Sequence, residues 1–281
     1  MIMTNHSLTE LEQFENWLTA NGNSENTRSA YIQRIGDFLS FTGGKVTRES
    51  IEQYFLNLQK IKKSKTVNCY RDAIIAYLDF KDLEIRLPKR HREEKKNPDW
   101  VSQERVEEQI IPLAEQTFKD VDRIAAILYL LFSSGLRRSE ICNLKREHIN
   151  LDKLTGKVYR QKNKDWHDFY FDAETALKLR TYFSSSEEEI NALNVNKGGI
   201  NYIFRVLKKE NLLKDIKLRP HLFRHSLLTH MLKKNVNLKR IQEVAGHQHL
   251  SSTERYLPSI KEDTEKAYRE CMRRETDKPA H

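Results

Sequence analysis

Residues 220–225 read PHLFRH and place an imidazole and a guanidinium one helical turn apart, directly after a proline. Proline is favoured at the first position of a helix, so Pro220 predicts that a helix begins here. His221 and Arg224 are three residues apart and would be neighbours on one face of that helix. Such a pair suits a flat anion such as a phosphodiester, but a buried ion pair or a chance surface pair would give the same spacing.

The segment around this stretch is strongly basic. From Val195 to Arg240 there are twelve lysines and arginines and two acidic residues, a charge of +10 over 46 residues. The whole chain of 281 residues has 49 basic and 40 acidic residues and a net charge of +9. This charge favours a polyanionic partner, either nucleic acid or an anionic membrane, and its concentration around one candidate site favours nucleic acid.

Other features of the sequence narrow the class of protein. It has no run of about 18 apolar residues that would predict a membrane span. Its start, MIMTNHSLTELEQF, lacks the basic and apolar regions of a signal peptide, so we expect a cytoplasmic protein. Cys69, Cys142 and Cys271 are odd in number and far apart, which predicts neither a disulfide framework nor a metal-binding cysteine pair.

The first ~90 residues have the apolar periodicity of four helices. Three of these helices are expected to begin at side chains that cap a helix N-terminus, and the candidates are Ser7 with Glu10, Ser24 and Thr47. Gly43 and Gly44 should end the second helix. The fourth helix is expected from about Ser64 to Phe80.

A basic segment, RLPKRHREEKKNPDW, follows these helices. Between Arg86 and Lys96 it has six basic residues against Glu93 and Glu94. We interpret residues 88–99 as a linker between a domain at 1–87 and a second domain at 100–281. A solvated surface loop would have the same composition and stays open as an alternative.

The second domain is again mostly helical, with one exception. Residues 156–171 read GKVYRQKNKDWHDFYF, in which two β-prone runs flank a polar turn that carries Lys162 and Lys164. This pattern is typical of a β-hairpin. We therefore expect a mainly α protein with a small antiparallel sheet.

Two other stretches supply further candidate residues. SSGLRRSEICNL places Arg137 after a glycine near a helix start, with Glu140 one turn later. AGHQHLSSTERYLP supplies His247 and, nine residues later, Tyr256. Taken singly, Arg137 would more often be an ion-pair partner of Glu140, and Tyr256 would more often be a packed aromatic side chain.

Together these stretches resemble the tyrosine recombinase (phage-integrase-like) family and its Xer-like members. GLRRSE at 135–140 is similar to the family's GLRxSE, HLFRH at 221–225 to HxLRH, and AGH at 245–247 to LGH. The intervals of 23 residues from Arg224 to His247 and nine from His247 to Tyr256 also resemble Xer-like members. Phe223 and Ala245 each stand where the family pattern has leucine, and the hairpin departs from the family's GKGxKxR.

The resemblance implies both the fold and the site. Residues 1–87 would form a four-helix, SAM-like core-binding domain and residues 100–281 a mostly helical catalytic domain. The implied catalytic residues are Arg137, Lys162, His221, Arg224, His247 and Tyr256, with Lys164 as the alternative to Lys162. No metal or other cofactor is expected, since the histidines at 225, 230, 247 and 249 come with no thiolate pair and no HExxH motif.

The activity implied by the resemblance is site-specific DNA recombination. Tyr256 would form a covalent 3′-phosphotyrosyl link on double-stranded DNA, in a tetramer on a specific recombination site. Xer-like resolution of chromosome or plasmid dimers is the preferred role, and the alternative is an integrase of a small virus or plasmid. More distant alternatives are a type IB topoisomerase and a DNA-binding protein without catalysis, and Tyr202 and Tyr268 are the other candidate nucleophiles.

Overall fold

The computed structural model describes residues 5–93, 99–160, 164–246 and 251–254. The chain divides into two compact units, Met1–Lys95 and Lys96–His281, and each unit has its own hydrophobic core. The fold is mainly α with one small antiparallel sheet, as expected from the sequence. Within the described ranges, no helix has both the length and the apolar composition needed to cross a membrane.

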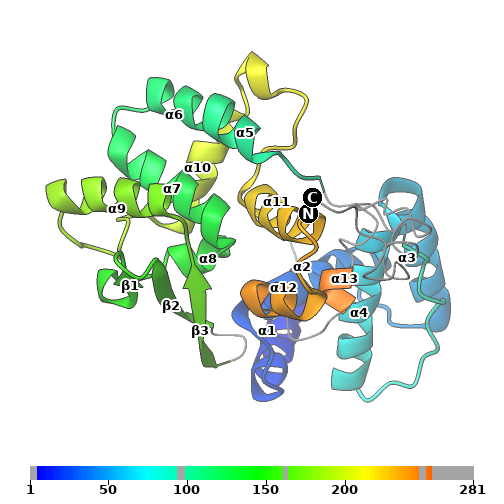
Figure 1. Cartoon of the computed structure of the whole chain (residues 1–281). Coiled ribbons are helices and arrows are strands. Elements are labelled where there is room, and N and C mark those ends of the chain that lie inside the picture. The colour runs from blue at the N-terminus through cyan, green and yellow to red at the C-terminus, as the bar shows by residue number, and fades with distance from the viewer. Residues whose placement is uncertain (1–4, 94–98, 161–163, 247–250, 255–281) are drawn as a thin grey trace, which may run out of the picture. The chain divides into compact units, whose positions relative to one another are not determined.

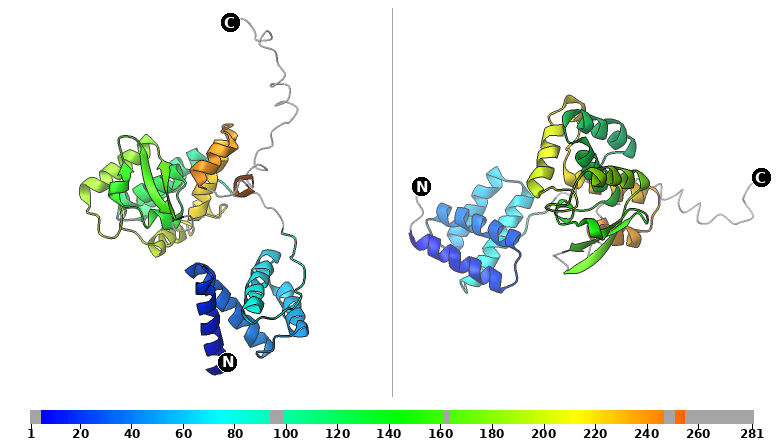
Figure 2. Two further views of the ribbon diagram at one scale, coloured as in Figure 1. Left: turned by 90° about the horizontal axis from the view of Figure 1, so that it is seen from below. Right: turned by 90° about the vertical axis from the view of Figure 1, so that its left-hand side faces the viewer.

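The N-terminal unit is a bundle of four helices, which Figures 1 and 2 show from three sides. Their bounds are α1 Asn5–Ala20, α2 Glu25–Thr42, α3 Arg48–Ile61 and α4 Ser64–Phe80. Apolar side chains spaced three and four residues apart meet in its core, among them Phe14, Phe38, Phe55 and Tyr77. The four predicted helices are confirmed.

Local capping explains three of these helix ends. The Ser24 hydroxyl accepts a hydrogen bond from the Thr27 backbone N–H at 3.3 Å, and the Thr47 hydroxyl accepts one from the Ser50 N–H at 3.2 Å. Gly43 ends α2 in the left-handed conformation, with φ +62°. The predicted cap at Ser7 is wrong, because α1 already begins at Asn5 and Ser7 lies inside it.

Residues 88–93, which we expected to belong to a linker, are attached to α4. The buried Asn68 side chain exchanges two hydrogen bonds with the backbone of His91, at 2.9 and 3.0 Å. Arg71 donates to the Pro88 carbonyl at 2.9 Å, and Arg90 pairs with Asp72 at 2.9 Å. This part of the segment therefore belongs to the N-terminal unit, and Arg90 has a carboxylate partner there.

The second unit contains the remaining elements. Its helices are α5 Gln103–Arg105, the π-helix η1 Val106–Ile110, α6 Ile111–Thr117, α7 Val121–Ser134, α8 Arg138–Ile141, the 3-10 helix η2 Arg146–His148, α9 Ala173–Ser185, α10 Lys197–Leu207, the 3-10 helix η3 Asn211–Leu213, α11 Pro220–Lys233, α12 Leu238–Ala245 and α13 Ser251–Glu254. Pro220 is the first residue of α11, which confirms the helix start predicted there.

The sheet has the order β1-β2-β3 and is antiparallel throughout. Its strands are β1 Ile149–Asn150, β2 Thr155–Arg160 and β3 Asp165–Tyr170. The β2–β3 pair confirms the predicted hairpin. Along β2 the side chains alternate, so that Val158 and Arg160 are buried while Lys157 and Tyr159 are exposed.

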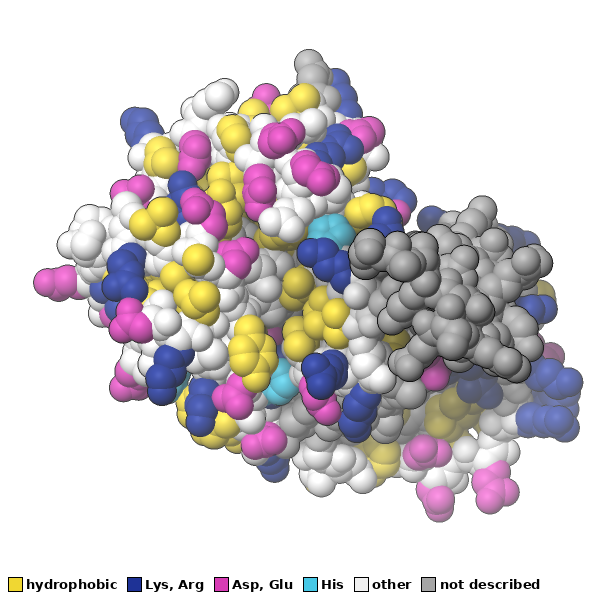
Figure 3. Space-filling view, in the orientation of Figure 1, with side chains coloured by type: hydrophobic (Ala, Val, Ile, Leu, Met, Phe, Trp, Pro, Cys, Tyr) yellow, Lys and Arg dark blue, Asp and Glu magenta, His cyan; other side chains and the backbone are white. Residues whose placement is uncertain are grey.

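The surface of this unit carries charges of both signs. On the face that Figure 3 shows, lysine and arginine side chains are interspersed with aspartate and glutamate. Several are paired, as in Arg180–Asp152 at 2.7 Å and Lys145–Glu188 at 3.0 Å. Exposed pairs of this kind contribute little to stability, typically about 0–1 kcal/mol each.

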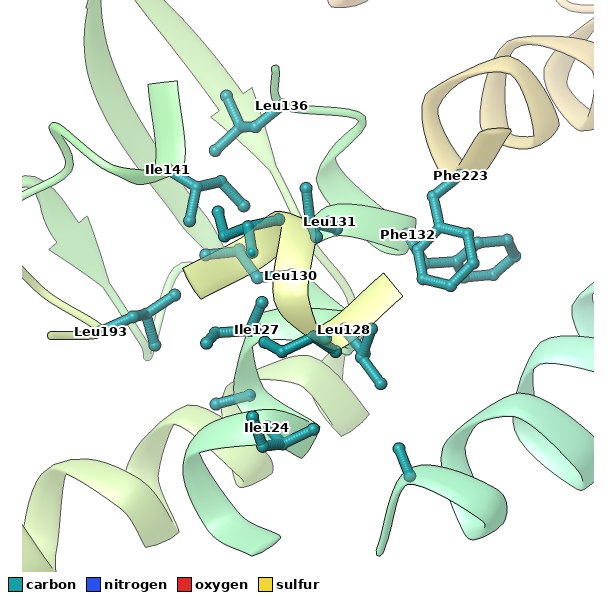
Figure 4. Close-up of a cluster of buried hydrophobic side chains, with 14 of the residues drawn as sticks. Ile124, Ile127, Leu128, Leu130, Leu131, Phe132, Leu136, Ile141, Leu193 and Phe223 are labelled. Atoms are coloured by element: carbon teal, nitrogen blue, oxygen red, sulfur yellow. The ribbon is translucent and has the colours of Figure 1, made fainter. Parts of the chain in front are cut away.

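Helix α7 is the central element of the second unit and packs against α6, α9 and α11. Nine of its fourteen residues are buried, which explains its nearly continuous apolar sequence. The rings of Phe132 on α7 and Phe223 on α11 meet edge to face, with centroids 5.7 Å apart (Figure 4). This contact fixes α11 beside the end of α7, and Arg224 follows Phe223 directly.

Candidate active site

Arg137 lies in the tight connection between α7 and α8. Gly135 ends α7 with φ +62°, and Arg137 then precedes the first residue of α8. The carboxylate of Glu140 accepts hydrogen bonds from the Arg137 backbone N–H and from its guanidinium Nη1, both at 2.7 Å. Glu140 is buried, whereas the Arg137 side chain is 34% exposed. The expected pairing of the two residues is present, and it leaves Arg137 accessible.

A second guanidinium contacts the same carboxylate. Arg160, on the inward face of β2, is only 5% exposed and has its Nε 3.0 Å from Oε1 of Glu140. Burial by itself would raise the pKa of Glu140, but the charge of Arg160 and the contacts with Arg137 outweigh it and hold that pKa below its ordinary value. Glu140 is therefore ionised at neutral pH.

Arg160 was not among the residues predicted from the sequence. A signal for it existed, because the alternation of β2 places position 160 on the inward face beside Val158. A charged residue on the buried face of a strand requires a partner. That partner, Glu140, could be identified only once the loop after α7 was placed next to β2.

Arg224 is 4% exposed and joins two segments that are far apart in the sequence. Its Nη1 donates to the Gly135 carbonyl at 2.7 Å, and its Nη2 donates to the Ala245 carbonyl. These bonds tie α11 to the end of α7 and to the last residue of α12. The side chain is thereby held in one orientation.

The two candidate arginines converge on the end of α12. Arg137 Nη2 lies 3.4 Å from the carbonyl oxygen of Gly246, next to the Ala245 carbonyl that Arg224 contacts. Gly246 follows α12 in the left-handed conformation, with φ +55°. The structure therefore brings Arg137 and Arg224 together at the residues that directly precede His247.

The β-hairpin contacts the same end of α12. His167 on β3 has its Nε2 3.4 Å from the Val244 carbonyl. Burial, followed by the nearby charge of Arg160, lowers the pKa of His167, so its imidazole is neutral at pH 7. A neutral ring adds no further positive charge beside Arg160.

His221 lies in the first turn of α11, and its ring lies 6.3 Å from that of His225, between centroids. Partial desolvation lowers the pKa of His221, and the charges of Arg224 and Arg219 lower it further. The imidazole is therefore neutral at pH 7 and able to accept a proton, which is what a general base requires.

The other predicted catalytic residues, Lys162, His247 and Tyr256, lie outside the described residues, as does Tyr268. The alternative lysine, Lys164, is exposed and has φ +52° just before β3. The alternative tyrosine, Tyr202, is exposed on α10 with the Arg205 guanidinium 5.4 Å from its ring centroid. Among the described residues, neither Lys164 nor Tyr202 interacts with Arg137, Arg160 or Arg224.

Among the residues that the structure describes, no three His, Cys, Asp or Glu side chains are grouped so that they could hold a metal ion. His225 and His230, both on α11, are described, whereas His247 and His249 are not. Cys69 and Cys142 are free and partly buried, and Cys271 lies outside the described residues.

Comparisons with known proteins agree with this geometry. Residues 100–262, more than half of the chain, match the family model described as "Phage integrase family". Tyrosine recombinase XerA of Pyrococcus furiosus is 29% identical over 268 residues, which cover 92% of this chain and 93% of the relative. A tyrosine recombinase of Pseudothermotoga lettingae is 30% identical over 85% of this chain and 90% of its own length.

Solved structures share the fold. The Tn1549 transposon integrase in complex with transposon right end DNA aligns with a TM-score of 0.70 at 14% identity, over 94% of this chain and 99% of the other. XerH site-specific recombinase bound to its difH substrate aligns with a TM-score of 0.69 at 14% identity, over 93% and 84%. The family match and the two similar relatives agree with the arrangement of Arg137 and Arg224 at the end of α12. The chain therefore belongs to the phage integrase family and is a Xer-like tyrosine recombinase, an enzyme that cuts and rejoins DNA.

Proposed function

We propose that this protein is a site-specific recombinase that cleaves duplex DNA by forming a covalent link between Tyr256 and the 3′-phosphate. One observation carries the proposal. Arg137 and Arg224, from distant segments of the chain, both contact the end of α12 directly before His247. Residues of the three motifs that resemble the family are thus adjacent in space.

Two arginines suit the chemistry of phosphodiester cleavage. Attack on the phosphorus builds negative charge on the non-bridging oxygens, and guanidinium groups bind such oxygens with paired hydrogen bonds. Arg137 is held by the carboxylate of Glu140 and Arg224 by two backbone carbonyls, so both guanidinium groups are oriented before DNA binds. Preorganised charge of this kind is usually the largest contribution to catalysis.

The proposed reaction proceeds in two steps. In the first, the Tyr256 oxygen attacks the phosphorus, neutral His221 takes the phenolic proton, and the bond from phosphorus to the 5′-oxygen breaks. Lys162 gives a proton to the departing 5′-oxygen. In the second, the 5′-hydroxyl of another strand attacks the phosphorus and gives its proton to Lys162. The bond from phosphorus to the Tyr256 oxygen then breaks, and the phenol takes back its proton from His221. Because the ester keeps the energy of the broken bond, the cycle uses no ATP.

The proposed biological role is Xer-like resolution of chromosome or plasmid dimers in the cytoplasm. It is supported by the relatives named XerA, which match nearly the whole chain, whereas the transposon integrase is similar in fold alone. Residues 1–87 would be the core-binding domain and residues 100–281 the catalytic domain. Exchange between two duplexes needs four cleavages, so we propose a tetramer on a specific site.

Covalent capture tests this proposal. The protein is incubated with fragmented genomic DNA of its source organism, washed in denaturing detergent, and the DNA that stays attached is sequenced. We expect one short site with inverted repeats, in the chromosome or a resident plasmid. A site at the border of a mobile element would favour the integrase, and attachment without sequence preference would favour a topoisomerase. No retained DNA would overturn the proposal.

A further inference from the structure

Arg160 is an unusual residue for a short, partly exposed sheet. Its side chain is 5% exposed, and its Nη1 is buried without a hydrogen-bond partner in the part of the chain that the structure describes. Its one charged partner there is Glu140, 3.0 Å from Nε. A buried guanidinium with unused donors is costly to keep, so its retention calls for a reason beyond stability.

The first reason concerns charge. Oε1 of Glu140 lies 2.7 Å from Nη1 of Arg137 and 3.0 Å from Nε of Arg160, so two guanidiniums share one carboxylate oxygen. If Arg137 were the only partner of Glu140, that ion pair would have no net charge, and its attraction for a phosphate would be weak. With Arg160 present, the group of three carries a net charge of +1, and the exposed member is Arg137.

The second reason concerns space. A Cβ atom added to Gly246 would lie 0.9 Å from Nη1 of Arg160, and 2.1 Å from the central carbon of its guanidinium. Glycine at this position leaves room for the guanidinium and also adopts the φ of +55° without strain. The site therefore accommodates Arg160 at the same turn that Arg137 contacts.

We propose that Arg160 is a positioning residue of this recombinase: by pairing with Glu140 beside Gly246, it keeps Arg137 oriented and its positive charge available for the DNA phosphate. The inference rests on the proposed function. Arg160 need not touch DNA, because its effect reaches the phosphate through Glu140 and Arg137.

A partly buried arginine of the same unit, Arg146, provides the control. The guanidinium of Arg146 donates to the Ser186 carbonyl at 2.6 Å and lies 4.5 Å from the ring centroid of Phe183. Its Nε is also buried without a hydrogen-bond partner within the described ranges. Within the described part of the chain, Arg146 has no interaction with Glu140 or with the end of α12, so Arg146→Gln should affect stability and leave cleavage unchanged.

The test measures single-turnover cleavage separately from binding. The substrate is the DNA recovered by covalent capture, nicked so that the cleaved strand cannot be rejoined. For Arg160→Gln we expect a cleavage rate about 10–100-fold lower at saturating protein, with noncovalent affinity changed less than about threefold. Arg160→Lys, which keeps the positive charge but not the planar guanidinium with its several N–H donors, should recover part of the cleavage rate.

A double variant tests whether Arg160 acts through Glu140. If it does, Glu140→Gln combined with Arg160→Gln should cleave within about threefold of the slower single variant, because both changes disrupt one unit. The double variant removes both buried charges, those of Glu140 and Arg160. We therefore expect it to fold and to be measurable even if Arg160→Gln alone does not fold.

Three results would overturn the inference: normal cleavage by Arg160→Gln, multiplied losses in the double variant, or an equal loss of cleavage in Arg146→Gln at the same loss of thermal stability.

These failures are distinct from a failure of the proposed function. If the wild-type protein forms no covalent complex, the recombinase proposal is wrong and this inference with it. If the wild type cleaves and Arg160→Gln cleaves equally well, only the role of Arg160 is wrong.

Discussion

At the residue scale, the proposed role of His221 as general base predicts how the cleavage rate depends on pH. Desolvation and the charge of Arg224 hold the pKa of its imidazole below the ordinary 6.5. Below that pKa the ring is protonated and cannot accept the phenolic proton, and above it the ring is neutral. We expect the rate of covalent cleavage to rise with pH through a midpoint below 6.5 and to be level at pH 7.

The matched variant for this prediction is His221→Gln, which keeps a polar group of similar size. Since a general base contributes about 10²–10⁴-fold, the plateau rate of this variant should fall by that order and the acid-side inflection should disappear. An inflection that persists in His221→Gln would assign the titration to another group.

The identity of the general acid can be tested with sulfur. A thiolate leaves without protonation, because the pKa of a thiol is about 8.5. On a substrate with sulfur in place of the 5′-bridging oxygen, Lys162→Ala should cleave almost normally, although it cleaves the oxygen substrate very slowly. Arg224→Ala should be slow on both substrates. Rescue seen only in Lys164→Ala would transfer the role to Lys164.

The candidate site residues named from the sequence are those that belong to contiguous motifs. Arg137, His221 and Arg224 could be named because their neighbours in the chain form recognisable boxes. Arg160 could not, because what defines it is a contact with Glu140, twenty positions away, and the space left by Gly246. Pairings between distant segments are a property of the fold, and a single sequence does not encode them in any local pattern.

At the scale of elements, local rules succeeded where the cause is local. Ser24, Thr47 and Gly43 cap their helices as expected, since capping depends on a few adjacent residues. The cap at Ser7 failed because the helix continues one turn further towards the N-terminus. The attachment of residues 88–93 to α4 was also missed, because it depends on Asn68, more than twenty residues earlier.

That attachment makes a prediction about the end of the N-terminal unit. Asn68 is fully buried and provides both a donor and an acceptor to the backbone of His91. Asn68→Ala would remove both partners from the N–H and C=O of His91 in this partly buried contact, at a cost of about 1–3 kcal/mol. We expect a lower unfolding temperature and faster hydrogen exchange of the amides of residues 88–93.

A control for this prediction is Asn21→Ala. Asn21 also donates to a backbone carbonyl, that of Trp17 at 2.8 Å, but it is exposed at the end of α1. Water can replace that bond, so the change should cost less than Asn68→Ala. Equal losses in the two variants would show that the contact with His91 contributes nothing specific.

At the scale of the whole molecule, the proposed tetramer depends on contacts between copies of the chain. Residues 262–281 follow the proposed nucleophile and lie outside the described residues. By resemblance to the family, we expect them to pack on a neighbouring protomer. A variant truncated before Glu262 should bind one half of the recombination site normally but recombine at least about tenfold more slowly. Electrophoresis of DNA complexes would measure the binding, and a plasmid resolution assay would measure the recombination. Normal recombination by this variant would exclude the role.

The account as a whole depends on a covalent bond between one tyrosine and DNA. The most direct measurement traps the complex on a nicked site, digests protein and DNA, and identifies by mass spectrometry the peptide that carries the nucleotide. We predict that the modified residue is Tyr256, and that Tyr256→Phe binds the same DNA with unchanged affinity yet forms no detergent-resistant complex. A nucleotide on Tyr202 or Tyr268, or a covalent complex that persists in Tyr256→Phe, would contradict the account.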